Sequence, residues 1–562
     1  MTKHVGRSAI ARIVLLAASA VVCWAQSTPQ FTVSLNPVTM PGLPSLQSSA
    51  WAQSGGKWLL VGGRTNGLHL FVQSSNNGAT PPPNAFPTAS ANTNLWVIDP
   101  VNQKVYSESL QSAVLSSTIV AQLSANNAQR AQNGDTLYII GGYGSNGPNM
   151  ITFPYLTAIQ VSEAINAIIN QQPLTNYVQQ TNTFVDCPQA GANAVASCQA
   201  QQQQQPCPTG PTYQQCIQQQ QSTCLQQQQQ ATAQCASQVQ NGSVSGLPTD
   251  TGYYARVTGG GMAQVGNYYY LVMGQDFEGL YSTAQGDYGK WPLNQVYTQQ
   301  IAAFWFTPPP NLSAAVLQVW QQDPNDQSAP YHRRDLNVVP ELSASGAPEN
   351  IGVYGGVFVP GQDVAYRQPI LIQNASNLAQ VSAKVQKYQQ LMSQYECAQL
   401  SMADQAGGNM IQVFFGGISL YFLDYKTMKL RMDEGLPFIQ NLSTVIHNSS
   451  GVWSEFVGTE PLPGLMGADA MFIPNPSVTS VAAAPNGVIL LNKLQGRTLV
   501  GWIFGGIVAS TPETGITKTP PPQASNALYE VWVMPGTPPA NYWIPAVAPV
   551  ATTAAPPPKP TS

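Results

Sequence analysis

One pattern recurs along this chain and limits its fold more than any other feature: an apolar, β-rich run that ends in paired glycines. Glycine adopts positive φ without steric cost, so the pair suits a buried strand that bends where neighbouring sheets crowd together. Five copies keep both glycines and a sixth keeps one. The runs are KWLLVGG (57–63), DTLYIIGG (135–142), YYYLVMGQ (268–275), IGVYGG (351–356), IQVFFGG (411–417) and LVGWIFGG (499–506).

The six copies predict an all-β fold, a six-bladed β-propeller with four antiparallel strands in each blade, over residues 26–536. A pair of β-sandwiches is the alternative. The last blade lacks an outer strand, whereas the segment FTVSLNP (31–37) near the N-terminus has strand character. We expect residues 31–37 to complete the last blade, because that pairing covers two sheet edges that would otherwise attract other strands.

The paired-glycine strands and the WVIDP turn (96–100) resemble the Kelch and galactose-oxidase class of propellers. Longer segments over most of residues 253–536 resemble an uncharacterised family of secreted bacterial Kelch-like proteins. These segments are YHRRDLNVVPEL (331–342), YECAQLSMAD (395–404), FFGGIS (414–419), EGLPFIQNLSTVIHNSSGVWSE (434–455) and NGVILLNKLQGRTLVGWIFGGI (486–507). The resemblance implies a propeller and an exported protein, and it implies no activity.

The first 25 residues have the order of a secretory signal peptide: Lys3, Arg7 and Arg12 precede an apolar run that ends at Ala25. That run is too short to span a bilayer, which takes about 20 residues. We therefore expect an exported protein without a transmembrane segment, located at the cell surface, outside the cell or in the periplasm.

Charge excludes some partners. Removal of residues 1–25 leaves 18 basic and 25 acidic side chains, so the mature chain is net negative. Nucleic acid and anionic membranes are bound through basic patches, and neither is expected as a partner.

Residues 186–250 form a Cys- and Gln-rich insertion between the second and third blades. Its cysteines are Cys187, Cys198, Cys207, Cys216, Cys224 and Cys235. Six cysteines in an exported segment predict three disulfides, with the connectivity open. Cys224 and Cys235 lie three turns apart on one helical face, which indicates a stapled helical hairpin. The hairpin is either a rigid spike or a docking surface for a partner. No C-x₂-C pair or nearby His indicates a metal site.

Two further segments are set apart from the blades. Apolar residues of the insertion 374–396 fall at helical spacing and predict a short amphipathic helix. The remaining cysteine, Cys397, is expected to be buried and free. Residues 537–562 form a Pro-rich tail that we expect to be disordered.

The sequence carries no recognisable catalytic motif and predicts no cofactor. A copper radical oxidase needs two His ligands, two Tyr and a cross-linking Cys, whereas the mature chain has only His69, His332 and His447. Nucleophile elbows, zinc-binding HExxH helices and phosphate-binding glycine loops are also missing.

One concentration of charge occurs in the body of this charge-poor chain, where only 8% of residues are charged. It opens the innermost strand of blade four, and basic residues occur at the corresponding places of blades two and three. Convergence of these side chains at one mouth of the central channel would make a site for an anionic ligand. The alternative is that they tie neighbouring blades together. The candidate residues are Arg130, Arg256, Tyr331, His332, Arg333 and Arg334.

Two functions remain in view. The first is an exported, non-catalytic binding protein that contacts proteins or glycans through the propeller faces and the Cys/Gln-rich spike. The second is a carbohydrate-active enzyme, epimerase- or lyase-like, that acts on an acidic sugar at the propeller mouth. A periplasmic assembly factor is a third possibility. The oligomeric state is left open.

Overall fold

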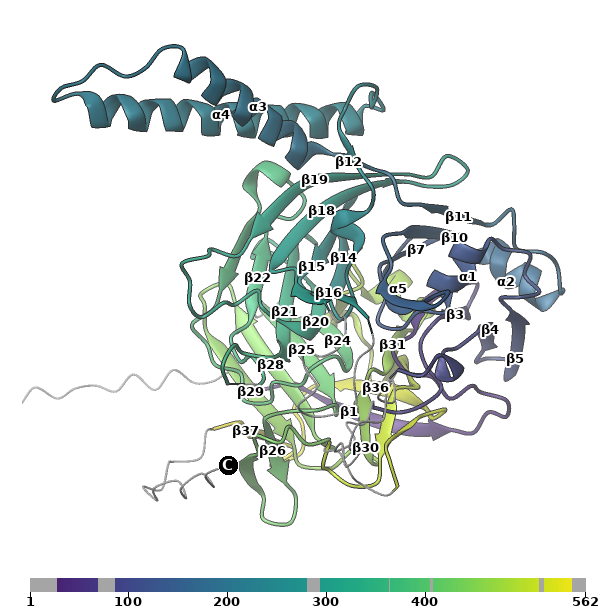
Figure 1. The fold of residues 1–562 in the computed structure, drawn as a ribbon. Coiled ribbons are helices and arrows are strands. Elements are labelled where there is room, and N and C mark those ends of the chain that lie inside the picture. The colour runs from purple at the N-terminus through teal and green to yellow at the C-terminus, as the bar shows by residue number, and fades with distance from the viewer. Residues whose placement is uncertain are drawn as a thin grey trace, which may run out of the picture.

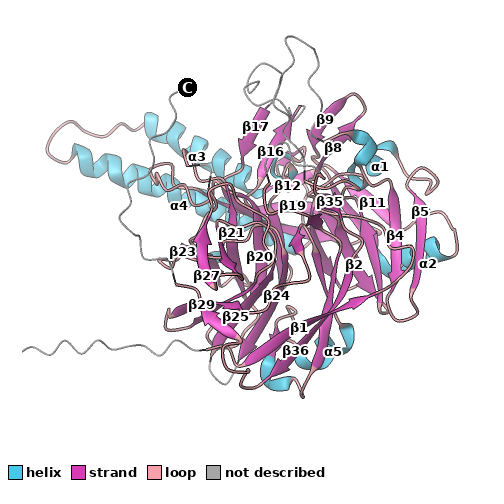
Figure 2. Ribbon diagram, turned by 90° about the horizontal axis from the view of Figure 1, so that it is seen from below, coloured by secondary structure: helices cyan, strands magenta, loops and turns pink. Residues whose placement is uncertain are grey.

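The computed structural model describes residues 28–68, 86–279, 294–362, 364–404, 408–514 and 520–547. The described residues are mostly β, as the sequence predicts: strands dominate, and the helices lie around the outside (Figures 1 and 2). None of the described helices is both long and apolar enough to cross a membrane. The predicted signal peptide, residues 1–25, lies outside the described residues.

Six sheets follow one another along the chain, each with four antiparallel strands at its centre. Sheet 1 has β2 (Ala50–Ser54), β3 (Lys57–Val61), β4 (Asn94–Asp99) and β5 (Lys104–Ser109), and sheet 2 has β6 (Gln129–Asn133), β7 (Thr136–Ile140), β10 (Leu156–Gln160) and β11 (Val178–Thr181). Sheet 3 has β14 (Gly261–Val265), β15 (Tyr268–Val272), β18 (Gln300–Thr307) and β19 (Ser313–Gln321), and sheet 4 has β20 (Arg334–Glu341), β21 (Asn350–Val357), β22 (Ile370–Gln373) and β23 (Ser382–Val385). Sheet 5 has β24 (Ala398–Asp404), β25 (Asn409–Phe415), β28 (Leu442–Asn448) and β29 (Trp453–Gly458), and sheet 6 has β31 (Met471–Pro474), β33 (Thr498–Phe504), β36 (Leu528–Pro535) and β1 (Phe31–Val38).

Short elements extend or connect these sheets. Sheet 3 gains β12 (Phe184–Asp186) and β13 (Thr249–Asp250), and sheet 5 gains β32 (Ile489–Leu490) and β37 (Trp543–Pro545). The smaller sheets pair β8 (Tyr143–Asn146) with β9 (Asn149–Thr152), β16 (Gln275–Glu278) with β17 (Asn294–Tyr297), β26 (Tyr421–Asp424) with β27 (Lys429–Met432), and β34 (Ile507–Ala509) with β30 (Leu465–Ala468) and β35 (Gln523–Ala524). The short helices are α1 (Ser117–Leu123), α2 (Val161–Ile169) and α5 (Pro476–Ala482).

Apolar cores lie between consecutive sheets, and a core of the same kind lies between sheet 6 and sheet 1. Leu59 of sheet 1 packs in one cluster with Leu137 of sheet 2. Trp502 of sheet 6 and Trp58 of sheet 1 have ring centroids 5.4 Å apart. All eight residues of β21 are buried, as expected for a strand covered on both faces. Burial on both faces explains why the paired-glycine strands are continuous apolar runs rather than alternating ones.

The glycine pairs sit where one sheet touches the next. Both glycines of every pair have positive φ, and Met273, which replaces the first glycine of the third copy, has φ of 55°. A Cβ on Gly141 or on Gly416 would lie only 2.0 Å from a backbone oxygen of the following sheet region. The prediction that these glycines permit bending and close approach is confirmed.

The N-terminal strand completes sheet 6. β1 pairs with β36 over its whole length, from Phe31 opposite Pro535 to Val38 opposite Leu528, so the predicted pairing is confirmed.

The predicted disordered tail, 537–562, is wrong for residues 537–547. There β37 pairs with β29, and Trp543 is buried with its indole N–H donating to the Phe31 carbonyl oxygen at 2.8 Å. Residues 548–562 lie outside the described residues.

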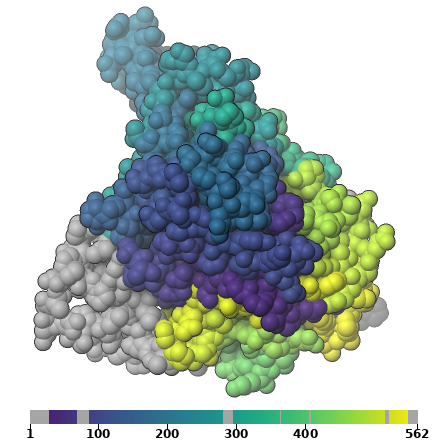
Figure 3. Space-filling view, turned by 90° about the vertical axis from the view of Figure 1, so that its right-hand side faces the viewer, coloured from purple at the N-terminus to yellow at the C-terminus, as the bar shows by residue number. Residues whose placement is uncertain are grey.

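The Cys- and Gln-rich insertion is the stapled helical hairpin that the sequence predicts. Helices α3 (Cys187–Gln203) and α4 (Tyr213–Gln240) extend away from the body (Figures 1 and 3). Disulfides join Cys187 to Cys235, Cys198 to Cys224, and Cys207 to Cys216, so all six cysteines pair among themselves. Cys397 is buried and free, as predicted.

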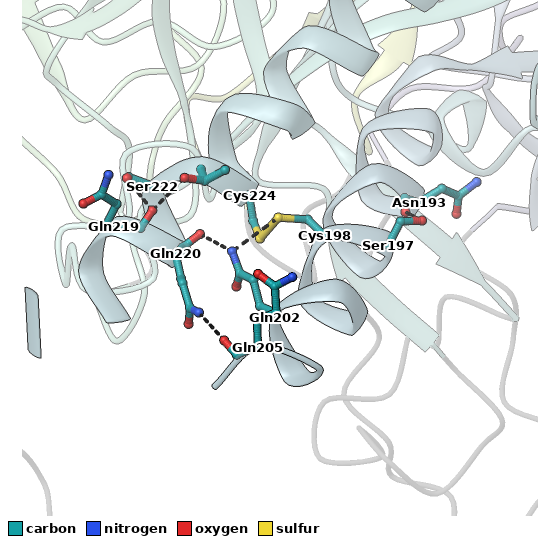
Figure 4. The surroundings of a disulfide bond; sticks show 10 residues. Asn193, Ser197, Cys198, Gln202, Gln205, Gln219, Gln220, Ser222 and Cys224 are labelled. Atoms are coloured by element: carbon teal, nitrogen blue, oxygen red, sulfur yellow. Dashed lines mark hydrogen bonds between the residues drawn. A yellow bond between two sulfur atoms is a disulfide. The ribbon is translucent and has the colours of Figure 1, made fainter. Parts of the chain in front are cut away.

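The hairpin is anchored only at its base. There Cys235, Ala236 and Val239 pack against Ala315 and Leu317 of β19. Farther out, the Cys198–Cys224 disulfide lies beside glutamine side chains that bond to backbone: the Gln202 amide donates to the Gln220 carbonyl oxygen at 2.7 Å (Figure 4). The outer part therefore depends on its cross-links rather than on a hydrophobic core.

The predicted helix in residues 374–396 is wrong. Residues Ser382–Val385 form β23, the fourth strand of sheet 4, and the only helical turn is a single 3₁₀ turn at Leu378–Gln380. The backbone N–H groups of Leu391 and Met392 both donate to the buried Glu455 carboxylate at 2.7 Å. The backbone groups that a helix would pair internally bond instead to strand β22 and to the Glu455 carboxylate.

We predict that deleting residues 30–37 destabilises the whole body. The deletion removes the buried Phe31 and Val33 side chains and exposes the edge of β36. Loss of two such side chains costs about 3 to 6 kcal/mol, and the lost strand ladder adds to it. Chemical denaturation of the purified protein measures the change. An unchanged free energy of unfolding would show that β1 contributes nothing to the body.

Candidate functional site

Six residues at the beginning of the first strands of the six sheets are joined by backbone hydrogen bonds. They are Ser48, Asn127, Gly259, Asp335, Glu396 and Asp469, and φ is positive at each, between 28° and 63°. The N–H of each donates to the carbonyl oxygen of its counterpart in the preceding sheet, with N···O distances between 2.6 and 3.4 Å. The series returns to its start, because Ser48 donates to Asp469. We call these six residues the hydrogen-bond ring.

Positive φ at these positions has a direct purpose. It turns each peptide so that its N–H faces one neighbouring sheet and its carbonyl faces the other. Gly259 adopts this conformation freely, and Asn127, Asp335 and Asp469 belong to the types that tolerate it best. The ring therefore selects small polar residues for its positions, apart from Glu396.

The ring brings together three carboxyl groups. Burial raises the pKa of Asp335, of Glu396 and of Asp469, the last to about 7. Mutual repulsion adds to the effect, because Glu396 is near both aspartates and Asp469 is near Asp335. A raised pKa favours the protonated carboxyl, which can donate as well as accept hydrogen bonds.

Arg334 is the basic group of this region. Its Nε lies 3.4 Å from Asp335 Oδ2, and its Nη1 donates to Gln275 Oε1 at 2.8 Å. The guanidinium also lies over the Phe358 ring, 5.2 Å from the centroid. Arg334 is thus held by three neighbours and lowers the pKa of Asp335 against the effect of burial.

A cavity of about 90 Å³ adjoins the ring. Ring residues and amides line one part of it, and aromatic and aliphatic side chains line the rest, among them Phe86, Tyr143, Phe277 and Ile418. The room suits waters or a small polar ligand. Within the described ranges, no three or more His, Cys, Asp or Glu side chains are arranged to hold a metal ion.

Arg130 lies three residues beyond Asn127 of the ring, at the position that Trp51 occupies relative to Ser48. Its guanidinium lies over the Trp51 ring, 3.6 Å from the centroid. Burial lowers the pKa of Arg130 to about 9. The residue belongs to a contact between sheets 1 and 2 and does not line the cavity.

The other predicted residues are dispersed. Arg256 pairs with Glu278 at 2.8 Å. His332 stacks on Tyr297 with centroids 3.8 Å apart, and Tyr331 is buried in the core between sheets 3 and 4. Of the six predicted residues, the structure places only Arg334 in the cavity lining.

The prediction that Arg333 faces the mouth is wrong. Its side chain is completely buried, with Nε donating to the Pro330 carbonyl oxygen at 2.7 Å and Nη1 to that of Gly355 at 3.0 Å. Tyr366 covers the guanidinium at 4.2 Å from the ring centroid. Arg333, just before β20, is thus a structural tie, whereas Arg334, the first residue of β20, lines the cavity.

Sequence reasoning missed the ring carboxyls as site residues. Asp335 was visible only as a partner of the basic cluster, and Glu396 and Asp469 have no local motif. The available signal was their position: each lies at or just before the start of the first strand of a repeat, in a chain with few charges.

The comparisons with known proteins leave the function open. No family model matches the chain, and neither does any curated protein. The solved structure titled "Structure of YjhT" matches at 11% identity, covering 87% of this chain and 99% of that chain, with a TM-score of 0.38. A likeness at this TM-score carries no argument, so function has to be argued from the residues themselves.

We predict that Arg333→Ala is strongly destabilising. It would leave buried carbonyl oxygens without donors and a void beneath Tyr366, at a cost of about 3 to 5 kcal/mol. Arg256→Ala is the matched control, since an exposed ion pair contributes about 1 kcal/mol or less. Equal effects of the two substitutions on denaturation midpoints would contradict the structural role of Arg333.

The ring carboxyls predict a pH dependence of stability. Between the ordinary carboxyl pKa of about 4 and the raised pKa of Asp469, about 7, the folded protein holds protons that the unfolded chain has released. The free energy of unfolding should therefore fall as pH rises through this window. The free energy of unfolding of Glu396→Gln should fall less steeply, because glutamine has no proton to lose. At pH 8 this variant should be more stable than the parent by about 1 kcal/mol or more. Parallel slopes for the two proteins in denaturation series at different pH would refute this origin.

Proposed function

We propose that the six sheets are the blades of a six-bladed, Kelch-like β-propeller. Three observations support this: the four-stranded repeat, the apolar cores between consecutive sheets including the sixth and the first, and the hydrogen-bond ring. A propeller leaves only short, protected sheet edges, and here β1 covers the last one.

We further propose that the protein is exported and acts by binding a protein partner through the α3–α4 hairpin. Three disulfides are typical of proteins that fold in an oxidising compartment. The hairpin carries the proposal because it adds nothing to the body beyond its base. Helix α4 alone, 28 residues long, extends about 40 Å.

Rigidity is the physical advantage of this design. A Gln-rich segment without a core would stay disordered, and ordering it on binding would cost affinity. The two long-range disulfides fix the helices against each other at eleven-residue intervals, so the arm is ordered before any partner arrives. Tyr213 and Leu225 of α4 are exposed on it and offer apolar contact area.

The alternative, an enzyme for an acidic sugar at the mouth, gains less support from the geometry. An anionic ligand in the cavity would meet one guanidinium that is already paired with Asp335. It would also face the carboxyl groups of Glu396 and Asp469. We therefore favour the binding protein.

Site-specific cross-linking tests the binding function. A photoreactive residue at Leu225 in the full-length protein, expressed in the producing bacterium, should give a discrete cross-linked product with one protein. The same residue at Val101, which is 78% exposed on sheet 1, is the matched control and should not give that product.

Removal of one disulfide supplies a second control. The double substitution Cys198→Ser and Cys224→Ser should lower the stability of the outer hairpin by about 3 kcal/mol and leave the sheets intact. It should also weaken the cross-link. Identical products from both positions, or none from Leu225, would overturn the proposal.

A further inference from the structure

A second hollow, larger than the cavity at the ring, lies between sheets 4 and 5. It has a volume of about 560 Å³, within the range of small-ligand sites. The turn after β20 and strands β22 and β23 form one side, and the ends of β24, β25 and β28 with Trp453 of β29 form the other. We call it the sheet 4–5 cleft.

A buried Glu–His pair lies at the wall of this cleft. Glu341 is completely buried, and its Oε2 is 3.0 Å from Nε2 of His447. Its Oε1 accepts from the Tyr354 hydroxyl at 2.7 Å and from the Gln412 amide at 3.3 Å. Glu341 and His447 are thus hydrogen-bonded through Glu341 Oε2 and His447 Nε2.

His447 lines the cleft, and its Nε2 is engaged by the contact with Glu341. The imidazole is 7% exposed and stacks on Trp453 with centroids 4.3 Å apart, so its plane is fixed. The imidazole has one further hydrogen-bonding nitrogen, Nδ1. Among the described residues no group bonds to Nδ1, although His447 lines the cleft.

Neighbouring groups complete a polar lining of balanced charge. Trp453 also lines the cleft, and no hydrogen bond from its indole N–H to another described residue is present. Gln373 and Asn409, on opposite sides of the cleft, each offer an amide that can donate and accept. Among the described residues, the charged members of the lining are Lys384 and Asp404, one of each sign. Such a lining matches hydroxyl groups, which donate and accept, rather than a net charge.

We propose that the sheet 4–5 cleft binds an uncharged saccharide, with one hydroxyl donating to His447 Nδ1 and another group accepting from the Trp453 indole N–H. Glu341 is a positioning residue that fixes the imidazole through its Nε2. The site rests on neither the hairpin nor its partner.

A glycan array carrying neutral, sialylated and uronic-acid glycans, probed with the purified mature protein, tests the ligand class. Neutral glycans should be bound in preference to acidic ones. Trp453→Phe keeps the stacked ring and removes only the indole donor, so it should weaken binding of the best neutral glycan about 3- to 10-fold. His332→Asn is the matched control, because that histidine lies outside the cleft, and it should bind as the parent does.

A spectroscopic readout separates ligand contact from a structural role. With ¹⁵N-labelled histidine, the Nδ1 resonance of His447 should shift when the neutral glycan is added, whereas that of His332 should not. Absence of binding to any neutral glycan, preference for acidic glycans, or unchanged affinity in Trp453→Phe would each overturn the proposal. Loss of the hairpin cross-link would leave it untouched, so the two proposals fail independently.

Discussion

The hydrogen-bond ring is the constraint on which the rest of this structure depends. Each of its six peptides must present an N–H to one sheet and a carbonyl to the next, which requires positive φ at six equivalent positions. The ring holds the first strands at backbone distance from each other. Neighbouring sheets can approach this closely only if the second strand of each sheet ends in residues without bulky side chains, where it meets the next sheet. The paired glycines meet that requirement, with Met273 as the exception.

Much of the fold was predictable because its signals are local or periodic. The glycine pairs mark the second strand of every sheet, an unpaired strand at the N-terminus matches a missing one in sheet 6, and six clustered cysteines can satisfy one another. The insertion 374–396 was mispredicted because helical spacing of apolar residues also arises when a short strand precedes a pinned loop. Nothing near Leu391 reveals that Glu455, more than 60 residues later, holds its backbone. Tertiary context decided that segment.

The candidate site was less predictable, for the same reason. Arg333 and Arg334 look equivalent in the sequence. In the fold, however, the Arg333 side chain is in the core and Arg334 lines the cavity. The ring carboxyls come from three separate sheets, so no spacing links them. His447 similarly gains its orientation from Glu341, 106 residues away. A single sequence shows residue types; the fold decides which of them meet.

The pairing of β1 with β36 has a consequence for how the molecule is made. About 500 residues separate these partners, so the first strand to be synthesised waits for almost the whole chain before it finds its place. Until then sheet 6 has an open edge and Phe31 has no neighbours, a state that invites intermolecular pairing. Assembly is consequently all or nothing at its last step: a chain truncated anywhere before residue 528 has no partner for β1 at all. Factors that prevent growing chains from pairing with one another would act in the period after β1 is synthesised and before β36 is available.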